Sequence, residues 1–148
     1  MRLGERLLRK LTRPMGRIHV RLYRLSGGAL GGRIGRAPVL LLTTTGRRTG
    51  QQRTTPLLYL ADGDRLVVVA SYGGAPRHPA WFLNLEATPD VVAQVRRDSR
   101  PVRAREATVE EREVYWPRLV AIYRYYDSYQ RKTSRTIPVV ILEPRPVG

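Results

Sequence analysis

Runs of apolar and β-branched residues, separated by turn signals, occupy the middle of the chain. Residues 38–45, 53–60 and 65–71 form three such runs, and Asp62-Gly63 marks a turn between the last two. Apolar and β-branched residues favour buried strands, and Asp-Gly is a strong hairpin signal. The pattern predicts a three-strand antiparallel meander in this region.

Helical signals appear farther along the chain. A proline near the start and Thr88-Pro89 after the end predict a short helix over residues 78–85. Thr108 and Glu111 form a capping box, which predicts a second helix over about residues 109–123. The remaining pattern predicts a turn over residues 97–100, strands over residues 90–95, 101–107 and 136–142, and a short helix over residues 125–132.

The order of these elements indicates the fold class. About six strands and three or four helices occur without the alternation of strand and long helix that builds a doubly wound sheet. We therefore predict an α+β, mainly β fold, in which helices cover an antiparallel β-barrel. The 148 residues give room for one core.

The amino-terminal segment has a different pattern, because apolar residues recur every three or four positions between arginines from Leu3 to Leu25. This spacing predicts a basic amphipathic helix with a break near Pro14 and Gly16. Two interpretations stay open: the helix covers the barrel and keeps its arginines in water, or it lies on an anionic membrane. The glycine-rich run 27–35 leaves a helix and enters a strand, so we interpret it as a flexible linker and not as a dinucleotide-binding motif.

We accordingly divide the chain into residues 1–36, which hold the basic helix and the linker, and residues 37–148, which form the barrel domain. Charges interrupt the leucines of the first ten residues, which lack the apolar core of a secretion signal. No uninterrupted apolar run approaches the roughly 18 residues that span a bilayer. The expected location is the cytoplasm, with peripheral contact at the inner face of the membrane as the alternative that the basic helix raises.

Charge and composition narrow the choice of partner. The net charge is +15, and residues 1–36 alone hold ten basic groups against one acid, which favours anionic partners. A nucleic-acid-binding barrel is disfavoured, because the aromatic residues gather near the carboxyl end and do not alternate with basic residues along the strands. With no cysteine and two histidines, disulfides and thiolate metal sites are excluded and no metal is expected.

Three features could carry chemistry. The hairpin from Gly46 to Gly50, with Arg53 nearby, is either an anion-binding clamp or an exposed basic turn. Ser71 ends a strand, where its hydroxyl could face a cavity, and His78 precedes a helix that it could cap. The third feature is a set of tyrosines spaced three apart, which would share one face of a helical segment and suit a planar ligand: Tyr123, Tyr126 and Tyr129. No catalytic triad or carboxylate pair is present, so a bound cofactor is expected to carry the chemistry.

Several motifs together resemble the deazaflavin-dependent nitroreductase family of actinobacteria. They cover about residues 37–144 in the family's order and are Leu-Leu-Leu-Thr-Thr-Thr-Gly-Arg-Arg-Thr-Gly-Gln at 40–51, Ser-Tyr-Gly-Gly at 71–74, His-Pro-Ala-Trp-Phe-Leu-Asn-Leu at 78–85, Tyr-Trp at 115–116 with the three tyrosines, and Arg-Thr-Ile-Pro at 135–138.

The resemblance implies a split β-barrel that binds coenzyme F420, a 5-deazaflavin with a lactyl phosphate and polyglutamate tail. It implies an F420H2-dependent reductase that passes hydride to a quinone-like, nitroaromatic or nitroimidazole acceptor. The alternatives are an F420-binding or FMN-binding split barrel with a different acceptor. By similarity the catalytic residues are Ser71, Tyr123, Tyr126 and Tyr129, with Ser71 donating a hydrogen bond to the acceptor. The cofactor site would comprise Arg47, Arg48, Thr49, Arg53, Thr54, Thr55, Pro56, Leu57, Leu58, Val69, Ala70, Ser71, Tyr72, Ala80, Trp81, Phe82, Leu83, Asn84 and Tyr126.

Overall fold

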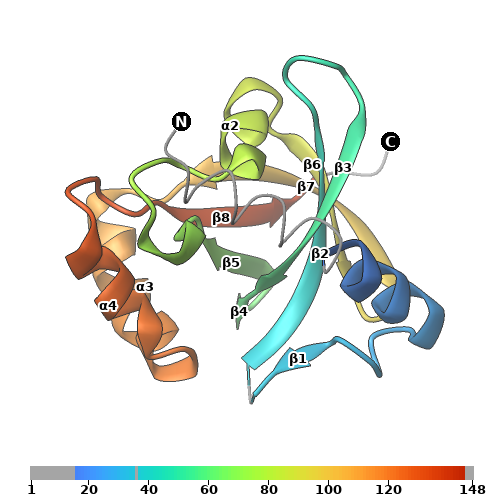
Figure 1. Cartoon of the computed structure of the whole chain (residues 1–148), viewed down its shortest axis with the longest axis horizontal. Coiled ribbons are helices and arrows are strands. Elements are labelled where there is room, and N and C mark those ends of the chain that lie inside the picture. Colours follow the sequence, from blue (N-terminus) through green and yellow to red (C-terminus); the bar gives the residue numbers. More distant parts are fainter. Residues whose placement is uncertain (1–15, 36, 146–148) are drawn as a thin grey trace.

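A computed structural model describes residues 16–35 and 37–145. Within these residues, eight strands form the centre of the structure, and the helices lie outside the sheet (Figure 1). The elements in chain order are β1 (Arg33–Ile34), β2 (Ala37–Thr45), β3 (Gln52–Leu58), β4 (Leu60–Asp62), β5 (Arg65–Val69), the 3-10 turn η1 (Tyr72–Gly74), α2 (Ala80–Ala87), β6 (Asp90–Val95), β7 (Asp98–Glu106), α3 (Val109–Ile122), α4 (Tyr125–Lys132) and β8 (Val139–Pro144). A further helix, without a label in Figure 1, covers residues 16–26.

The strands form one antiparallel sheet that curls into a split barrel. Its order is β1-β2-β6-β7-β8-β5-β4, and β3 also pairs with β2, from Val39 opposite Leu58 to Thr45 opposite Gln52. Tyr59 joins β3 to β4, and its N–H donates to the carbonyl oxygen of Pro38 (3.1 Å). The predicted fold class, an antiparallel barrel with covering helices, is confirmed. The structure adds the short strands β1 and β4 to the about six expected.

The predicted meander is confirmed in its strand order and in its turn at Asp62-Gly63, but its second strand is broken at Tyr59 into β3 and β4. β3 pairs with β2 and β4 pairs with β5, and β5 also pairs with β8, which the sequence did not predict. This last pairing follows from burial: residues 66–70 are all buried, and so are residues 137–142. A strand buried on both faces needs hydrogen-bonded neighbours on both edges, and a strand from the end of the chain supplies the second one.

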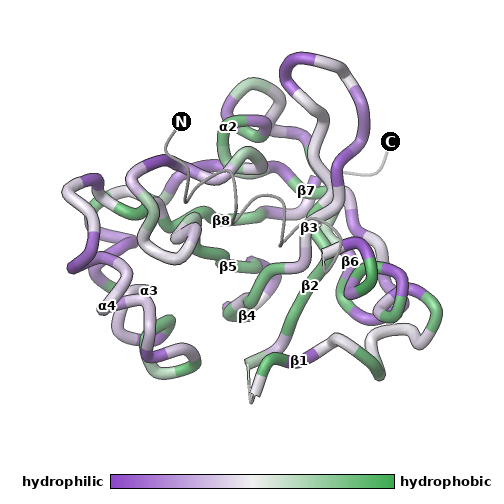
Figure 2. The backbone as a smooth tube through the Cα atoms, viewed as in Figure 1, coloured by the Kyte–Doolittle hydropathy of each residue, from purple (hydrophilic) through white to green (hydrophobic). Residues whose placement is uncertain are grey.

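Successive side chains of a strand point to opposite faces of the sheet and pack into two different hydrophobic cores. Leu66 and Val68 of β5 face the barrel interior, where α2 closes the core, whereas Val67 and Val69 pack against α3 and α4. Figure 2 shows β2 and β5 in the green of apolar residues and the tip of the β2–β3 hairpin in purple. The hairpin tip therefore extends polar side chains away from the packed sheet.

Most boundaries follow the sequence signals, with local differences. The strand β6 and the helix α4 match their predicted ranges, and α3 begins with the predicted capping box, in which Glu111 N–H donates to Thr108 Oγ1 (3.1 Å). The predicted turn over residues 97–100 is wrong, because the chain reverses at residues 96–97, where Arg96 has a φ of 56°. The last strand starts three residues later than predicted, since Thr136-Ile137-Pro138 precedes β8.

The helix over residues 16–26 lies against the barrel through one tyrosine. Tyr23 is fully buried with Val39 and Leu41, and its hydroxyl accepts a hydrogen bond from the N–H of Arg96 (2.6 Å). The helix ends at Gly27, whose φ of 60° allows Gly28 N–H to donate to the carbonyl oxygen of Tyr23 (2.9 Å). The glycine run therefore packs in turns and forms β1. The predicted helical residues before 16 lie outside the described part of the chain.

An ion-pair network joins α3 to the sheet. Arg105 of β7 contacts Glu111 (2.7 Å) and Glu143 (2.6 Å), and Arg65 of β5 also contacts Glu111 (3.3 Å). Hydrogen bonds from Arg105 and from the Thr108 N–H lower the pKa of Glu111 from its ordinary 4.5 to about 2. The ionised form of Glu111 is thus favoured in the folded chain.

Acid is expected to remove the stabilisation that the ionised Glu111 gives to the fold. Because the folded pKa of Glu111 is depressed, its stabilisation is present above pH 4.5 and disappears as the pH falls towards 2. Between pH 4.5 and pH 2, the free energy of unfolding of the parent should fall by about 1–2 kcal/mol more than that of Glu111→Gln. This difference allows for the partial exposure of Glu111, because water weakens the ion pair. Urea titrations at each pH measure it. Glu110→Gln, at an exposed position of the same turn, should behave like the parent, and equal acid slopes in parent and Glu111→Gln would contradict the assignment.

Candidate functional site

The β2–β3 hairpin presents exposed cations on a closed turn. Gly46 N–H donates to the carbonyl oxygen of Gln51 (2.7 Å), and Gly50, with a φ of 70°, donates to that of Gly46 (2.8 Å). Arg47 and Arg48 on this turn and Arg53 near the start of β3 are exposed, and none of the three forms an ion pair with a carboxylate in the described residues. Uncompensated guanidinium groups on a rigid turn suit an anionic ligand.

Asn84 of α2 holds the base of this hairpin. Its side chain is 4% exposed, and Oδ1 accepts from the N–H of Arg47 (3.1 Å) and from the Arg47 guanidinium (3.2 Å). Its Nδ2 donates to Oγ1 of Thr44 (3.2 Å). Both ends of the amide therefore have protein partners, and Asn84 fixes the position of Arg47.

Truncating this side chain should loosen the hairpin. Asn84→Ala leaves the buried Thr44 hydroxyl and the N–H of Arg47 without their partner, which costs about 1–3 kcal/mol of unfolding free energy. The orientation of Arg47 is lost as well, so we expect anionic ligands to bind about fivefold to tenfold more weakly. Urea unfolding and ligand titration measure the two effects. Glu86→Ala, an exposed position of the same helix, is the control, and parent-like values in Asn84→Ala would contradict the role of Asn84.

The predicted residues of β3, β5 and α2 are buried to different degrees. Trp81, Phe82 and Ala70 lie in the barrel core, whereas Val69 is buried in the outer core against α3 and α4. Residues 54–58 are half-buried, and the hydroxyls of Thr43 and Thr54 lie 2.8 Å apart. The ring of Phe82 also contacts that of His78 at 4.8 Å, which links α2 to the segment after β5.

The segment after β5 packs on α4. Ser71 and Tyr72 are half-buried, and Gly74 is buried with a φ of 77°. A Cβ atom on Gly74 would lie 2.7 Å from the carbonyl oxygen of Tyr129. A glycine is therefore needed here both for its backbone angle and for the close approach to α4.

The three predicted tyrosines lie close together, but on two different helices, one at the end of α3 and two in α4. Tyr123 caps the end of α3 with a φ of −150°, so the prediction that it shares a helical face with Tyr126 and Tyr129 is wrong. The chain reverses between α3 and α4, and this turn brings the hydroxyls of Tyr123 and Tyr129 to 3.0 Å. Tyr126 is 5% exposed and lies 4.9 Å from Tyr123, ring to ring, so it is a packed member of the outer core.

Burial keeps these phenols neutral. It raises the pKa of Tyr123 to about 12, with the hydrogen bond to Tyr129 as a further cause, and it also raises the pKa of Tyr126. At neutral pH both side chains are protonated and provide ring faces and hydroxyl groups.

The structure thus connects the predicted residues into a chain of contacts. Arg47 contacts Asn84 on α2, His78 contacts Phe82 on the same helix, and Gly74 contacts Tyr129 on α4. In the described residues, no hydrogen bond or ring contact joins Tyr123 or Tyr126 to the hairpin. Arg135 contacts the segment after β5, a role that the sequence does not reveal. In the sequence, only its place in the Arg-Thr-Ile-Pro motif, without a nearby acid and just before a buried strand, points to this residue.

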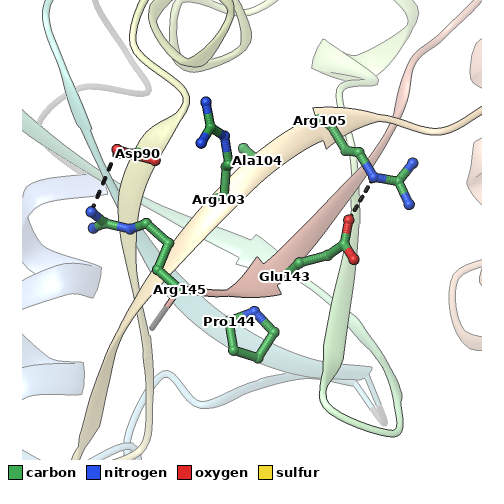
Figure 3. A pocket seen from close by; sticks show the side chains of 7 residues that line it. All are labelled: Asp90, Arg103, Ala104, Arg105, Glu143, Pro144 and Arg145. Carbon is green, nitrogen blue, oxygen red and sulfur yellow. Dashed lines mark hydrogen bonds and ion pairs between the residues drawn. The ribbon is translucent and has the colours of Figure 1, made fainter. Parts of the chain in front are cut away.

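A surface cavity of about 480 Å³ lies elsewhere, on β7 and β8 (Figure 3). Two of its arginines are already paired: Arg105 with Glu143 at 2.6 Å and Arg145 with Asp90 at 3.6 Å. None of the predicted site residues lines it. The cavity has acids as well as bases, so it fits an anionic ligand less well than the hairpin does.

Comparisons with known proteins agree on one family. The family model of F420H(2)-dependent quinone reductases matches residues 15–144. An F420H(2)-dependent quinone reductase of Mycobacterium tuberculosis is 44% identical over 135 residues, which cover 87% of this chain and 89% of that protein.

Solved structures are similar to this chain in fold and in sequence. The structure of an F420-H2 dependent reductase has a TM-score of 0.67 and 43% identity, and the match covers 72% of this chain and 94% of that chain. A chain solved as a domain-swapped dimer has a TM-score of 0.69 and 35% identity, with coverage of 95% and 99%. The chain described here belongs to the F420H(2)-dependent quinone reductase family.

Proposed function

We propose that this chain binds F420H2 against the β2–β3 hairpin and transfers hydride from it to a quinone. The observation that carries the proposal is a group of exposed, uncompensated arginines at 47, 48 and 53 in a member of this family, with Arg47 anchored to α2 through Asn84. An F420 tail of phosphate and glutamate carboxylates is the kind of polyanion that guanidinium groups bind.

The residues of the site fit this cofactor. Arg47, Arg48 and Arg53 would hold the anionic tail, while the half-buried residues 54–58 and the segment 69–72 would border the ring. When bound, the reduced deazaflavin supplies a hydride, because carbon at position 5 disfavours one-electron chemistry. The role of the chain is then to orient, to exclude water and to polarise the acceptor.

Three groups would act on the acceptor. Ser71 has a hydroxyl beside the predicted ring position and would donate a hydrogen bond to the acceptor oxygen. The rings of Tyr123 and Tyr129 would form an apolar wall. Because the pKa of Tyr123 is raised to about 12, this phenol is a weak acid, which favours solvent as the source of the final proton.

A turnover assay tests the proposal. Reduced F420 is mixed with a menaquinone analogue, and in parallel with a nitroimidazole, and its oxidation is followed by absorbance. We expect oxidation with the quinone, slower oxidation with the nitro compound, and no binding of flavin mononucleotide at concentrations that saturate F420. A chain that binds flavin mononucleotide and ignores F420 would contradict the proposal.

We further propose that the helix over residues 16–26 makes peripheral contact with anionic lipids at the inner face of the cell membrane. Ile18, Leu22 and Leu25 are exposed along one side of this helix, and arginines at 17, 21 and 24 flank them. In the described part of the chain, no helix is both long and apolar enough to cross a bilayer.

Vesicle sedimentation tests this contact. We expect the chain to bind vesicles that contain anionic lipid more tightly than neutral vesicles, and Leu22→Asp/Leu25→Asp to abolish the difference. Equal binding of parent and variant would favour the interpretation in which the helix only covers the barrel.

A further inference from the structure

Arg135 lies between α4 and β8, and its side chain reaches back to the segment after β5. Its Nε donates to the carbonyl oxygen of Ala75 (2.8 Å), and its terminal nitrogens donate to those of Ser71 (2.7 Å) and Ala70 (3.2 Å). The nitrogen that binds Ala70 also lies 3.1 Å from Nδ1 of His78. One guanidinium group therefore holds residues 70–78 at four points.

The backbone held in this way is strained. Tyr72 has a φ of 46°, and Gly73 and Gly74 follow with 62° and 77°. Left-handed angles are costly for a residue with a large side chain and persist only where the surroundings impose them. Arg135 on one side and the backbone of Tyr129 on the other impose this conformation.

In the part of the chain that the structure describes, no acidic side chain pairs with the charge of Arg135. The hydrogen bonds of its guanidinium group go only to carbonyl oxygens and a ring nitrogen. Burial lowers the pKa of Arg135, but an arginine side chain stays protonated at neutral pH. A positive charge therefore sits directly behind Ser71, compensated only by peptide dipoles.

We propose that Arg135 is a positioning residue for hydride transfer, which fixes Ser71 and Tyr72 through three carbonyl oxygens and keeps a positive charge behind Ser71. The inference rests on the proposed function, because it assigns Arg135 a role in that reaction. A planar guanidinium group can donate hydrogen bonds to three carbonyl oxygens at once. A lysine side chain supplies the positive charge but cannot donate in these three directions. A fixed charge near the acceptor oxygen stabilises the negative charge that develops there.

His78 provides a readout of this arrangement that does not depend on turnover. Arginine has only donors, so Nδ1 of His78 accepts, and the neutral ring carries its proton on Nε2. Within the described residues, Arg135 provides the hydrogen bond to the His78 ring that selects this tautomer.

Three variants of the full chain test the proposal. Arg135→Met removes the charge and the donors, Arg135→Lys keeps the charge, and Arg131→Met changes an exposed arginine of α4. With reduced F420 and a quinone analogue, we expect kcat to fall about 50-fold in Arg135→Met and about tenfold in Arg135→Lys, and to stay within about twofold of the parent in Arg131→Met. The Kd for F420 should change less than about threefold in all three, because the hairpin arginines are untouched.

Nitrogen NMR of histidine-labelled, cofactor-free protein gives the second measurement. We expect the Nε2-protonated tautomer of His78 in the parent and in Arg131→Met, and a mixture of tautomers in Arg135→Met. A folded Arg135→Met with parent-like kcat and tautomer would overturn the proposal, and so would an equal loss of kcat and of F420 affinity in both Arg135 variants. If Arg135→Met does not fold, Arg135→Lys decides by the same criteria. A parent chain that fails to oxidise reduced F420 contradicts the proposed function instead, and the His78 tautomer then still decides whether Arg135 positions the segment.

Discussion

Removing two guanidinium groups from the β2–β3 hairpin is expected to weaken F420 binding by about 100-fold, since each charge-assisted contact contributes about 1.5 kcal/mol or slightly more. The variant is Arg48→Ala/Arg53→Ala, and each single change should cost about tenfold in Kd. Both side chains are exposed and without ion pairs in the described residues, so the fold should tolerate their loss. Fluorescence titration with F420 measures the Kd.

The matched control is Arg103→Ala, an exposed arginine of β7 that lines the cavity in Figure 3. It lowers the net charge of the chain without touching the hairpin, so its Kd should stay within about twofold of the parent. The dependence of Kd on salt should also be shallower in the double variant than in the control. A parent-like Kd in the double variant, or an equal loss in Arg103→Ala, would show that general charge and not the hairpin attracts the cofactor.

Tyr126→Ala is expected to lower the free energy of unfolding by about 3–5 kcal/mol, as for other large aromatic residues removed from a core. Tyr126 is 5% exposed and packs between Tyr123 and Trp116, with ring distances of 4.9 and 6.3 Å. Because the ring is buried, loss of packing is the main expected effect of this change. Urea unfolding measures the loss.

Two further variants separate packing from chemistry at this position. Tyr126→Phe keeps the ring and should change stability by less than about 1.5 kcal/mol, so a fall in kcat would then report on the hydroxyl alone. Tyr125→Ala, at a neighbouring position that is 46% exposed, should be close to neutral. An unchanged urea midpoint in Tyr126→Ala would mean that the outer core does not depend on this ring.

Local signals in the sequence were enough for most elements. The capping box of Thr108 and Glu111 marked the start of α3, and Thr88-Pro89 marked the end of α2. Such signals act within one turn of backbone, so a single sequence carries them in full. The resemblance to a known family then supplied the split barrel and the cofactor.

Long-range pairing and side-chain direction could not be read in this way. The pairing of β5 with β8 joins segments about seventy residues apart, for example Val67 opposite Ile141, and no local pattern specifies it. The same is true of Arg135, whose partners at residues 70–78 are distant in sequence. The three-residue spacing of the tyrosines predicted their clustering but not the chain reversal that produces it, because an identical spacing would fit one continuous helix.

The most direct test of the account is a crystal structure of the chain with F420. We expect the phosphate and glutamate groups against Arg47, Arg48 and Arg53, and the deazaflavin ring beside Ser71 and residues 54–58. A ring bound in the cavity between Asp90 and Glu143, or a tail that leaves the three hairpin arginines in solvent, would contradict the central claim.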